Sequence, residues 1–104
     1  MLCFLTARRL KPGTFERFRA AWEPDEWPAG FVRAYHLRNP QDPDEVISFG
    51  LFEGDTSDYR ILRSDTAAMA TEEKRQRDMA EFVESVGLDG VFEVIEEVTP
   101  PHRR

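Results

Sequence analysis

The spacing of the apolar residues changes several times along this chain, and the order of those changes constrains the fold more than any single motif. Alternating or short continuous apolar runs, which are typical of strands, occur in four stretches, 2–7, 30–38, 45–52 and 90–98. Apolar residues at helical spacing occur in two stretches, 14–22 and 55–87. The predicted order is therefore strand, helix, strand, strand, helix, strand.

This order predicts an α+β, ferredoxin-like subunit of the βαββαβ type with a four-stranded antiparallel sheet. The 104 residues suffice for one domain, which we place at 1–99, followed by a flexible tail at 100–104. A content of 40% hydrophobic and 33% charged residues is typical of a folded globular chain.

The third predicted strand is apolar on both faces. Strand alternation places Ile47, Phe49 and Leu51 on one face and Val46, Ser48, Gly50 and Phe52 on the other. A strand of this kind is expected to be buried on both sides. Because the predicted helices can cover only one side of the sheet, we expect a homodimer in which a second subunit covers the other side.

Turn and cap signals mark the ends of the first helix. Lys11-Pro12-Gly13 precedes it, and Thr14 is expected to cap it by accepting a hydrogen bond from an amide one turn later. Pro24 and Pro28 are expected to end this helix and to form a loop over 23–29.

The second helical region shows a cap, a break and an end. Asp55 is expected to cap it, and a break is expected within Ser64–Ala70. Four apolar residues at i, i+3, i+4 and i+7 predict that the helix continues through Met79, Phe82, Val83 and Val86. Gly87 is then expected to end it in a left-handed conformation. The charged run 72–78 is expected to form a solvated helix face with pairs at i, i+4.

Charge and cysteine content exclude several classes of protein. The net charge of −6 argues against nonspecific binding to nucleic acid or to an anionic membrane. No apolar stretch approaches the roughly 20 residues that a membrane span needs. The single cysteine, Cys3, excludes an internal disulfide and favours a reducing, cytoplasmic location. With two histidines and one cysteine, the sequence has no zinc-type ligand spacing, so we expect no metal site.

Three candidate catalytic residues lie in the second predicted strand. His36 has an ordinary pKa suited to proton transfer near neutrality, or it is a hydrogen-bonded surface or interface residue. Arg33 and Tyr35 share the strand face opposite to His36 and Arg38. They can hold a substrate anion, or they can be polar residues that keep an edge strand soluble.

Five further residues are candidates for substrate binding. Trp22 and Trp27 flank the loop after the first helix, where they can form the apolar mouth of a pocket or pack in the core. Thr6 and Ser48 are hydroxyls among apolar strand neighbours and can point into a cavity, although neither has an adjacent base that would make it a nucleophile. Tyr59, in the predicted short helix, completes the set.

Two segments resemble the antibiotic-biosynthesis-monooxygenase-type domains. The first is Arg8–Phe18, with its Lys11-Pro12-Gly13 turn before the helix, and the second is Gly30–Arg38 with the following turn 39–45. The resemblance extends over about residues 2–98. It implies a homodimeric α+β barrel whose sheets pack face to face, with a small pocket between sheet and helices in each subunit.

The resemblance also implies two kinds of chemistry. The cofactor-independent monooxygenases of this family oxidise activated aromatic substrates and steady a substrate anion with polar groups. The haem-degrading members use an Asn, a Trp and an axial His, but the corresponding places here hold Thr6, Ile61 and Thr71. Since threonine cannot supply the axial nitrogen, we expect no haem. The resemblance to the cofactor-independent members implies that no other cofactor is needed.

The function expected from the resemblance is therefore a cofactor-independent, monooxygenase-like reaction on a small aromatic or polyketide-like substrate. The alternative is a noncatalytic dimer that binds a ligand or serves in assembly, with its pocket filled by its own aromatic side chains.

Overall fold

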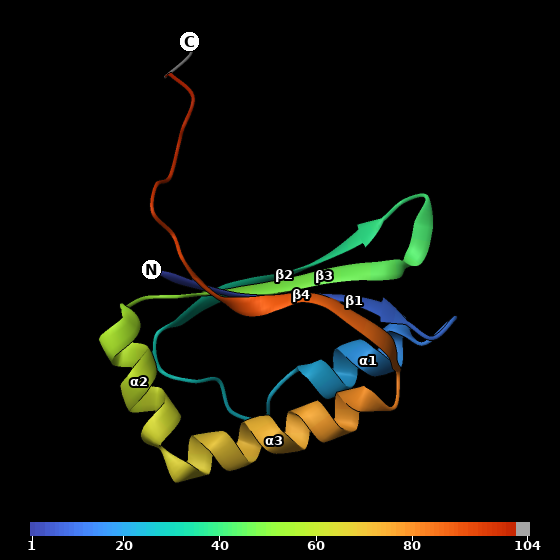
Figure 1. Cartoon of the computed structure of the whole chain (residues 1–104), viewed down its shortest axis with the longest axis horizontal. Helices are drawn as coiled ribbons and strands as arrows, with labels where there is room; N and C mark the ends of the chain where they lie inside the picture. The colour runs from blue at the N-terminus through green and yellow to red at the C-terminus, as the bar shows by residue number, and fades with distance from the viewer. Residues whose placement is uncertain (102–104) are drawn as a thin grey trace.

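A four-stranded antiparallel sheet with three helices on one side makes up the computed structural model, which describes residues 1–101 (Figure 1). In chain order the elements are β1 (Leu2–Leu10), α1 (Phe15–Trp22), β2 (Phe31–Asn39), β3 (Asp42–Phe52), α2 (Thr56–Ser64), α3 (Thr66–Ala80) and β4 (Val83–Glu93). The strands lie in the order β2-β3-β1-β4. The predicted ferredoxin-like βαββαβ fold is confirmed, with the second helical region divided into α2 and α3.

The prediction that a helix continues to Gly87 is wrong. Helix α3 ends at Ala80, and the backbone N–H of Phe82 donates to the carbonyl of Met79 in a closing turn. The Lys11 amide donates to the carbonyl of Phe82 at 2.9 Å, so the chain is already joined to the end of β1 there. Phe82 lies in the closing turn, and Val83 and Val86 belong to strand β4, although the three residues are spaced as in a helix.

Strand β4 contains an irregularity and ends earlier than expected. Thr6 pairs with Asp89 and Arg8 with Val86, so two β4 residues face the single residue Ala7. The strand ends at Glu93, which pairs with Leu2, the first residue of β1, rather than at residue 98. The next amide, that of Val94, donates to the Met1 carbonyl at 3.0 Å. The following segment leaves the sheet on the side away from the helices (Figure 1). Of the predicted flexible tail at 100–104, the last three residues lie outside the described part of the chain.

The helix caps agree with the predictions in one case and not in the other. Asp55 caps α2 by accepting from the amides of Ser57 and Asp58, and the Asp58 carboxylate accepts from the Asp55 amide at 2.9 Å. The break is confined to Asp65, which caps α3. Thr14 was expected to accept from a helix amide, but its hydroxyl donates to the Lys11 carbonyl at 2.7 Å and therefore closes the preceding turn.

The loop before α2 needs a glycine because the reciprocal hydrogen bonds of Asp55 and Asp58 bring the Asp58 side chain close to residue 54. Gly54 has a φ of +122°, and a Cβ built there would lie 2.7 Å from a carboxylate oxygen of Asp58. The close approach of the Asp58 side chain, which accepts from Asp55, therefore leaves no room for a side chain at residue 54.

The two faces of the sheet differ in burial. On the helix face, a core of fully buried side chains consists of Leu10, Phe18, Val46 and Met79. On the opposite face, which we call the open face, Tyr35 stacks on Phe49 with 5.1 Å between ring centroids. Open-face side chains that are 42–47% exposed are Tyr35, Leu37 and Phe92. Within the single chain, β3 is therefore buried on one face only.

Among the described residues, no helix is long and apolar enough to cross a membrane.

Candidate functional site

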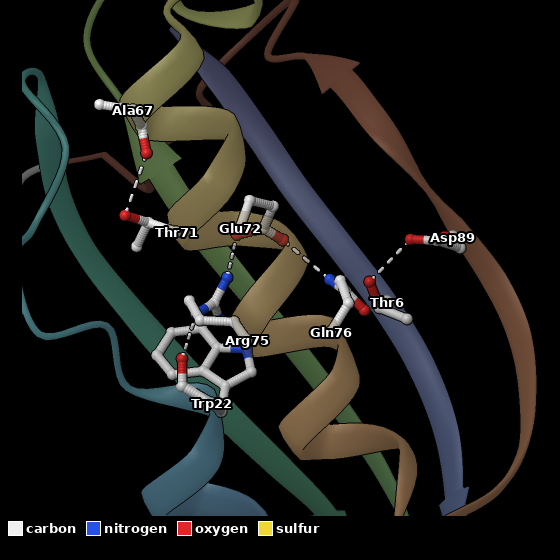
Figure 2. A network of polar contacts seen from close by, with 8 residues as sticks. All are labelled: Thr6, Trp22, Ala67, Thr71, Glu72, Arg75, Gln76 and Asp89. Atoms are coloured by element: carbon white, nitrogen blue, oxygen red, sulfur yellow. Dashed lines mark hydrogen bonds and ion pairs between the residues drawn. The ribbon is translucent and has the colours of Figure 1, made fainter.

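Four polar side chains form a row across the whole sheet on the face covered by helices. Backbone pairing aligns His36 of β2 with Ser48 of β3, Ser48 with Thr6 of β1, and Thr6 with Asp89 of β4. Nδ1 of His36 lies 2.7 Å from the Ser48 hydroxyl oxygen. The Thr6 hydroxyl donates to Asp89 at 2.8 Å (Figure 2). We call these four residues the polar row. They share a face because equal register and strand alternation bring them to the same side.

His36 lies among aromatic rings from α1. Its ring centroid is 4.6 Å from that of Trp22, 5.8 Å from Phe15 and 6.1 Å from Phe18, all approached edge-on. Burial lowers the pKa of His36, and the positive charges of Arg19 and Arg8 lower it further, against an opposite effect of Glu23. The imidazole is therefore neutral near pH 7 and can accept a proton.

Trp22 is held by a residue of α3 that the sequence analysis did not single out. Arg75 donates from Nε to the backbone carbonyl of Trp22 at 2.6 Å, and its guanidinium carbon lies 5.2 Å from the Trp22 ring centre (Figure 2). Glu72 accepts from Arg75 and, at 2.8 Å, from Gln76. Within the run 72–78, the predicted solvated pairs are confirmed by Lys74 and Asp78, whereas Arg75 turns towards α1.

Arg8 is the second residue that the sequence analysis missed. Its side chain faces the helices, only 7% of the residue is exposed, and its guanidinium carbon lies 5.2 Å from the Phe18 ring centre. Nη1 of Arg8 is buried and has no hydrogen-bond partner within residues 1–101. Burial lowers the pKa of Arg8. The signal was present in the alternation of β1, because Arg8 shares a face with Leu2, Phe4 and Leu10.

A series of aromatic contacts extends from Trp22 to α2 on the same side of the sheet. Successive ring centroids in it are 4.4–6.1 Å apart, through Trp22, Trp27, Phe31, Phe52, Phe4 and Tyr59. The structure thus brings the candidates Trp22, Trp27 and Tyr59 into one aromatic series. Trp27 is 43% exposed, so this end of the series reaches the surface.

Arg33 and Tyr35 do not join this group. Their backbone partners on β3 are Leu51 and Phe49, so both lie on the open face, opposite to His36. Within the chain, the three candidate catalytic residues therefore do not form one site, as the strand alternation predicts.

Within residues 1–101, a groove and a smaller hollow lie beside the helices, and His36 lines neither of them. The larger is a groove of about 260 Å³ between the end of α3 and the start of β4. It is lined by Arg8, Gln76, Met79, Ala80, Val83, Glu84, Ser85 and Val86. The smaller, of about 90 Å³, lies between the end of α1 and α3. Around His36 the space is occupied by the rings of α1.

The residues at the family's haem positions are dispersed. Thr6 belongs to the polar row, Ile61 of α2 is 68% exposed, and the Thr71 hydroxyl donates to the carbonyl of Ala67 in its own helix (Figure 2). In residues 1–101, no three side chains of His, Cys, Asp or Glu gather closely enough to hold a metal ion.

Comparison with solved structures identifies the fold. A candidate antibiotic biosynthesis monooxygenase from Chloroflexus aurantiacus J-10-fl superposes with a TM-score of 0.68 at 12% identity, over 94% of this chain and 96% of that one. A second such candidate, from Nitrosomonas europaea, has a TM-score of 0.62 at 13% identity, over 92% and 100% of the two chains. The fold is that of the antibiotic biosynthesis monooxygenase-like proteins. The resemblance found in the sequence is thereby confirmed at the level of the fold.

One neighbour among the antibiotic biosynthesis monooxygenase-like proteins is described by its activity. It is SnoaB from Streptomyces nogalater, a cofactor-independent oxygenase, with a TM-score of 0.59 at 16% identity over 97% of each chain. No protein-family model and no curated protein sequence matches the chain. At these identities the likeness establishes the shared fold alone.

Proposed function

We propose that this protein is a cofactor-independent, monooxygenase-like enzyme that acts on a small aromatic or polyketide-like substrate. The observation that carries the proposal is the His36–Ser48 pair, a neutral imidazole held on the helix side of a sheet whose fold is shared with an oxygenase. Aromatic side chains beside it, Trp22 above all, suit a planar substrate.

His36 is the proposed general base. In the tautomer in which Nδ1 donates to the Ser48 oxygen, Nε2 carries the lone pair that accepts a proton. Removal of a proton from an activated methylene leaves a carbanion, which adds O₂ and takes a proton back to form a hydroperoxide. Loss of water then leaves a carbonyl, so CH₂ and O₂ are converted to C=O and H₂O. Ser48 positions the imidazole, and Thr6 with Asp89 extends the polar side of the site.

A noncatalytic function is the second candidate, and one observation favours it. The rings of Phe15, Phe18 and Trp22 occupy the space around His36, and neither hollow described above is lined by His36. In this case the protein is a dimer that binds a ligand or serves in assembly. Catalysis requires that the substrate displaces one of these rings, whereas this alternative does not.

We also propose that the protein is a homodimer formed through the open face. Tyr35, Leu37 and Phe92 are 42–47% exposed there, and the Tyr35 ring stacks on that of Phe49. Sheet-on-sheet packing of two such faces would bury this apolar surface.

Oxygen uptake with anthrone as probe tests the enzymatic proposal. We expect the protein to consume one O₂ per anthrone above the background of buffer alone and to produce anthraquinone. His36→Gln keeps a side chain that can hydrogen-bond with Ser48 but removes the base, so the rate should fall by about 10²–10⁴-fold. Arg60→Gln, an exposed change on α2, is the matched control and should keep the full rate.

One result would reject this function, and another would reject the role of His36. Uptake by the unmodified protein that does not exceed background, with saturable quenching of tryptophan fluorescence by anthrone, would favour the noncatalytic alternative. An undiminished rate in His36→Gln would show that His36 is not the base.

A further inference from the structure

A buried cation, Arg8, lines the groove between α3 and β4; its guanidinium lies over the Phe18 ring, but one of its nitrogens lacks a hydrogen-bond partner within residues 1–101. Nη1 of Arg8 has no hydrogen-bond partner within residues 1–101, although the residue is only 7% exposed. Buried polar groups in folded proteins are almost always hydrogen-bonded, and the free-energy cost of leaving one without a partner is greatest for a charged group. An unpaired guanidinium in this place therefore calls for a ligand.

The charged residues around Arg8 form no ion pair with its guanidinium within the described residues. Asp89 of β4 and Glu72 of α3 face it at a distance, and Arg75 of α3 opposes them. The carboxylate of Asp89 accepts from Thr6, and that of Glu72 from Arg75 and Gln76. No ion pair within the described residues includes Arg8, so neither acid neutralises it at close range.

The groove has the composition of a site for an amphiphilic ligand. Its volume is about 260 Å³, and Arg8 lines it from β1. Met79 and Ala80 of α3 and Val83 and Val86 of β4 supply apolar walls. Glu84 also lines it, which disfavours a ligand with several negative charges. Val86 is 55% exposed, so the groove is open to solvent along the β4 edge of the sheet.

We propose that Arg8 is the anion-binding residue of a ligand site in the groove between α3 and β4, and that the ligand is a planar organic monocarboxylate. The apolar rings lie against Met79, Val83 and Val86, and the carboxylate accepts from the Arg8 guanidinium, which turns towards the groove so that its buried Nη1 can donate. This site goes beyond the proposed oxygenase reaction, because it holds equally for an enzyme and for a noncatalytic ligand-binding protein.

Calorimetric titration with 2-naphthoate and its neutral isostere 2-naphthamide tests the site without any oxidation step. The unmodified protein should bind the carboxylate at least tenfold more tightly than the amide. Arg8→Met should abolish this preference, and Arg8→Lys should keep part of it, because lysine supplies charge without the planar fork. The matched control is Arg38→Met, since the Arg38 guanidinium also covers an aromatic ring, Phe15, but is exposed. That variant should keep the preference in full.

A second pair of variants checks that the ligand lies in the groove. Ala80 is exposed and lines the groove, so Ala80→Trp should weaken binding of the carboxylate and of the amide by at least tenfold. Ala70→Trp, an exposed change on the same helix away from the groove, should leave both unchanged. Circular dichroism of each variant establishes that it is folded.

A direct readout comes from His36, whose imidazole lies within reach of the Arg8 charge. Neutralisation of Arg8 by a bound carboxylate should raise the pKa of His36, measured by proton NMR, whereas naphthamide should leave that pKa unchanged. The proposal is overturned by any of three results: no saturable binding of naphthoate, equal affinity for acid and amide, or a preference that survives Arg8→Met. Because none of these measurements uses oxygen uptake, failure of the oxygenase assay would not affect them.

Discussion

The indole of Trp22 meets the imidazole of His36 edge-on, with 4.6 Å between the ring centroids and 76° between the ring planes. Trp22 is the residue of α1 whose backbone carbonyl accepts from Arg75, and His36 belongs to the polar row, so the contact links the two. Because the two rings are in contact, the Trp22 indole can report the protonation state of the His36 imidazole.

Tryptophan fluorescence should report the protonation of His36. In Trp27→Phe the remaining indole is Trp22, and a protonated imidazole in contact with it should quench its emission. Since burial lowers the pKa of His36, the midpoint should lie below the ordinary value of about 6.5. In the double variant with His36→Gln this transition should vanish. A midpoint at or above 6.5 would contradict the predicted environment of the imidazole.

The same shift predicts how stability depends on pH. The folded state holds the pKa of His36 below its unfolded value, so the unfolded state binds more protons in the interval between the two values. The free energy of unfolding should therefore fall as the pH falls from about 6.5 through that interval, and His36 should contribute no slope above it. Urea titrations at a series of pH values should show a shallower slope in His36→Gln than in the unmodified protein.

Arg75 should stabilise the packing of α1 on α3. Its Nε donates to the Trp22 carbonyl, and its side chain is 17% exposed, so Arg75→Gln should cost about 1.5–3 kcal/mol. Lys74→Gln is the control on the adjacent residue, because the pair of Lys74 and Asp78 is solvated and should contribute little. Urea unfolding measures both. An equal decrease in the free energy of unfolding of the two variants would mean that the hydrogen bond from Arg75 to Trp22 contributes no more than the solvated pair.

Removal of the buried cation should make the protein more stable. Arg8→Met replaces an unpaired donor by an apolar side chain that can still contact Phe18, so we expect a gain of about 1–3 kcal/mol in the free energy of unfolding. Arg17→Met removes an exposed guanidinium over Phe82 and should change stability by less than about 0.5 kcal/mol. Thermal and urea unfolding decide the sign. A gain in stability with a loss of carboxylate binding would be the pattern of a residue kept for function.

The sequence predicted the order of the elements because strands and helices leave periods of two and of 3.6 in the apolar residues. It did not predict where α3 ends. The spacing of Met79, Phe82, Val83 and Val86 fits a helix, but the amide of Lys11 and the edge of β1 compete for the same backbone and form a turn and a strand instead. Pairing of this kind joins residues about 70 positions apart, so no local pattern can reveal it.

Some residues of the candidate site could be predicted from the sequence, and others could not. Thr6, Ser48 and His36 were recognisable as polar residues in apolar strands, and the register then aligns them in one row. Asp89 was not recognised, because the start and register of β4 had been misplaced. Arg75 was treated as one charge in a solvated run, and only the position of α1 shows that it turns inwards. Arg8 could have been found, since an arginine that alternates with Leu2, Phe4 and Leu10 faces the core.

A charged residue introduced on the open face should disrupt the proposed homodimer. Phe49 stacks on Tyr35 in the middle of this face, and Phe49→Glu would bury an unpaired carboxylate between two sheets. We expect this variant, and likewise Leu51→Glu, to be monomeric or unfolded, whereas the unmodified protein sediments as a dimer at micromolar concentration. Ile61→Glu makes the same change at an apolar residue of α2 that is 68% exposed, and it should remain dimeric. Sedimentation velocity measures all four proteins, with circular dichroism to separate monomers from unfolded chains. A folded monomer of the unmodified protein would mean that the open face is not an interface between two copies, and an intact Phe49→Glu dimer would place the interface elsewhere on the molecule.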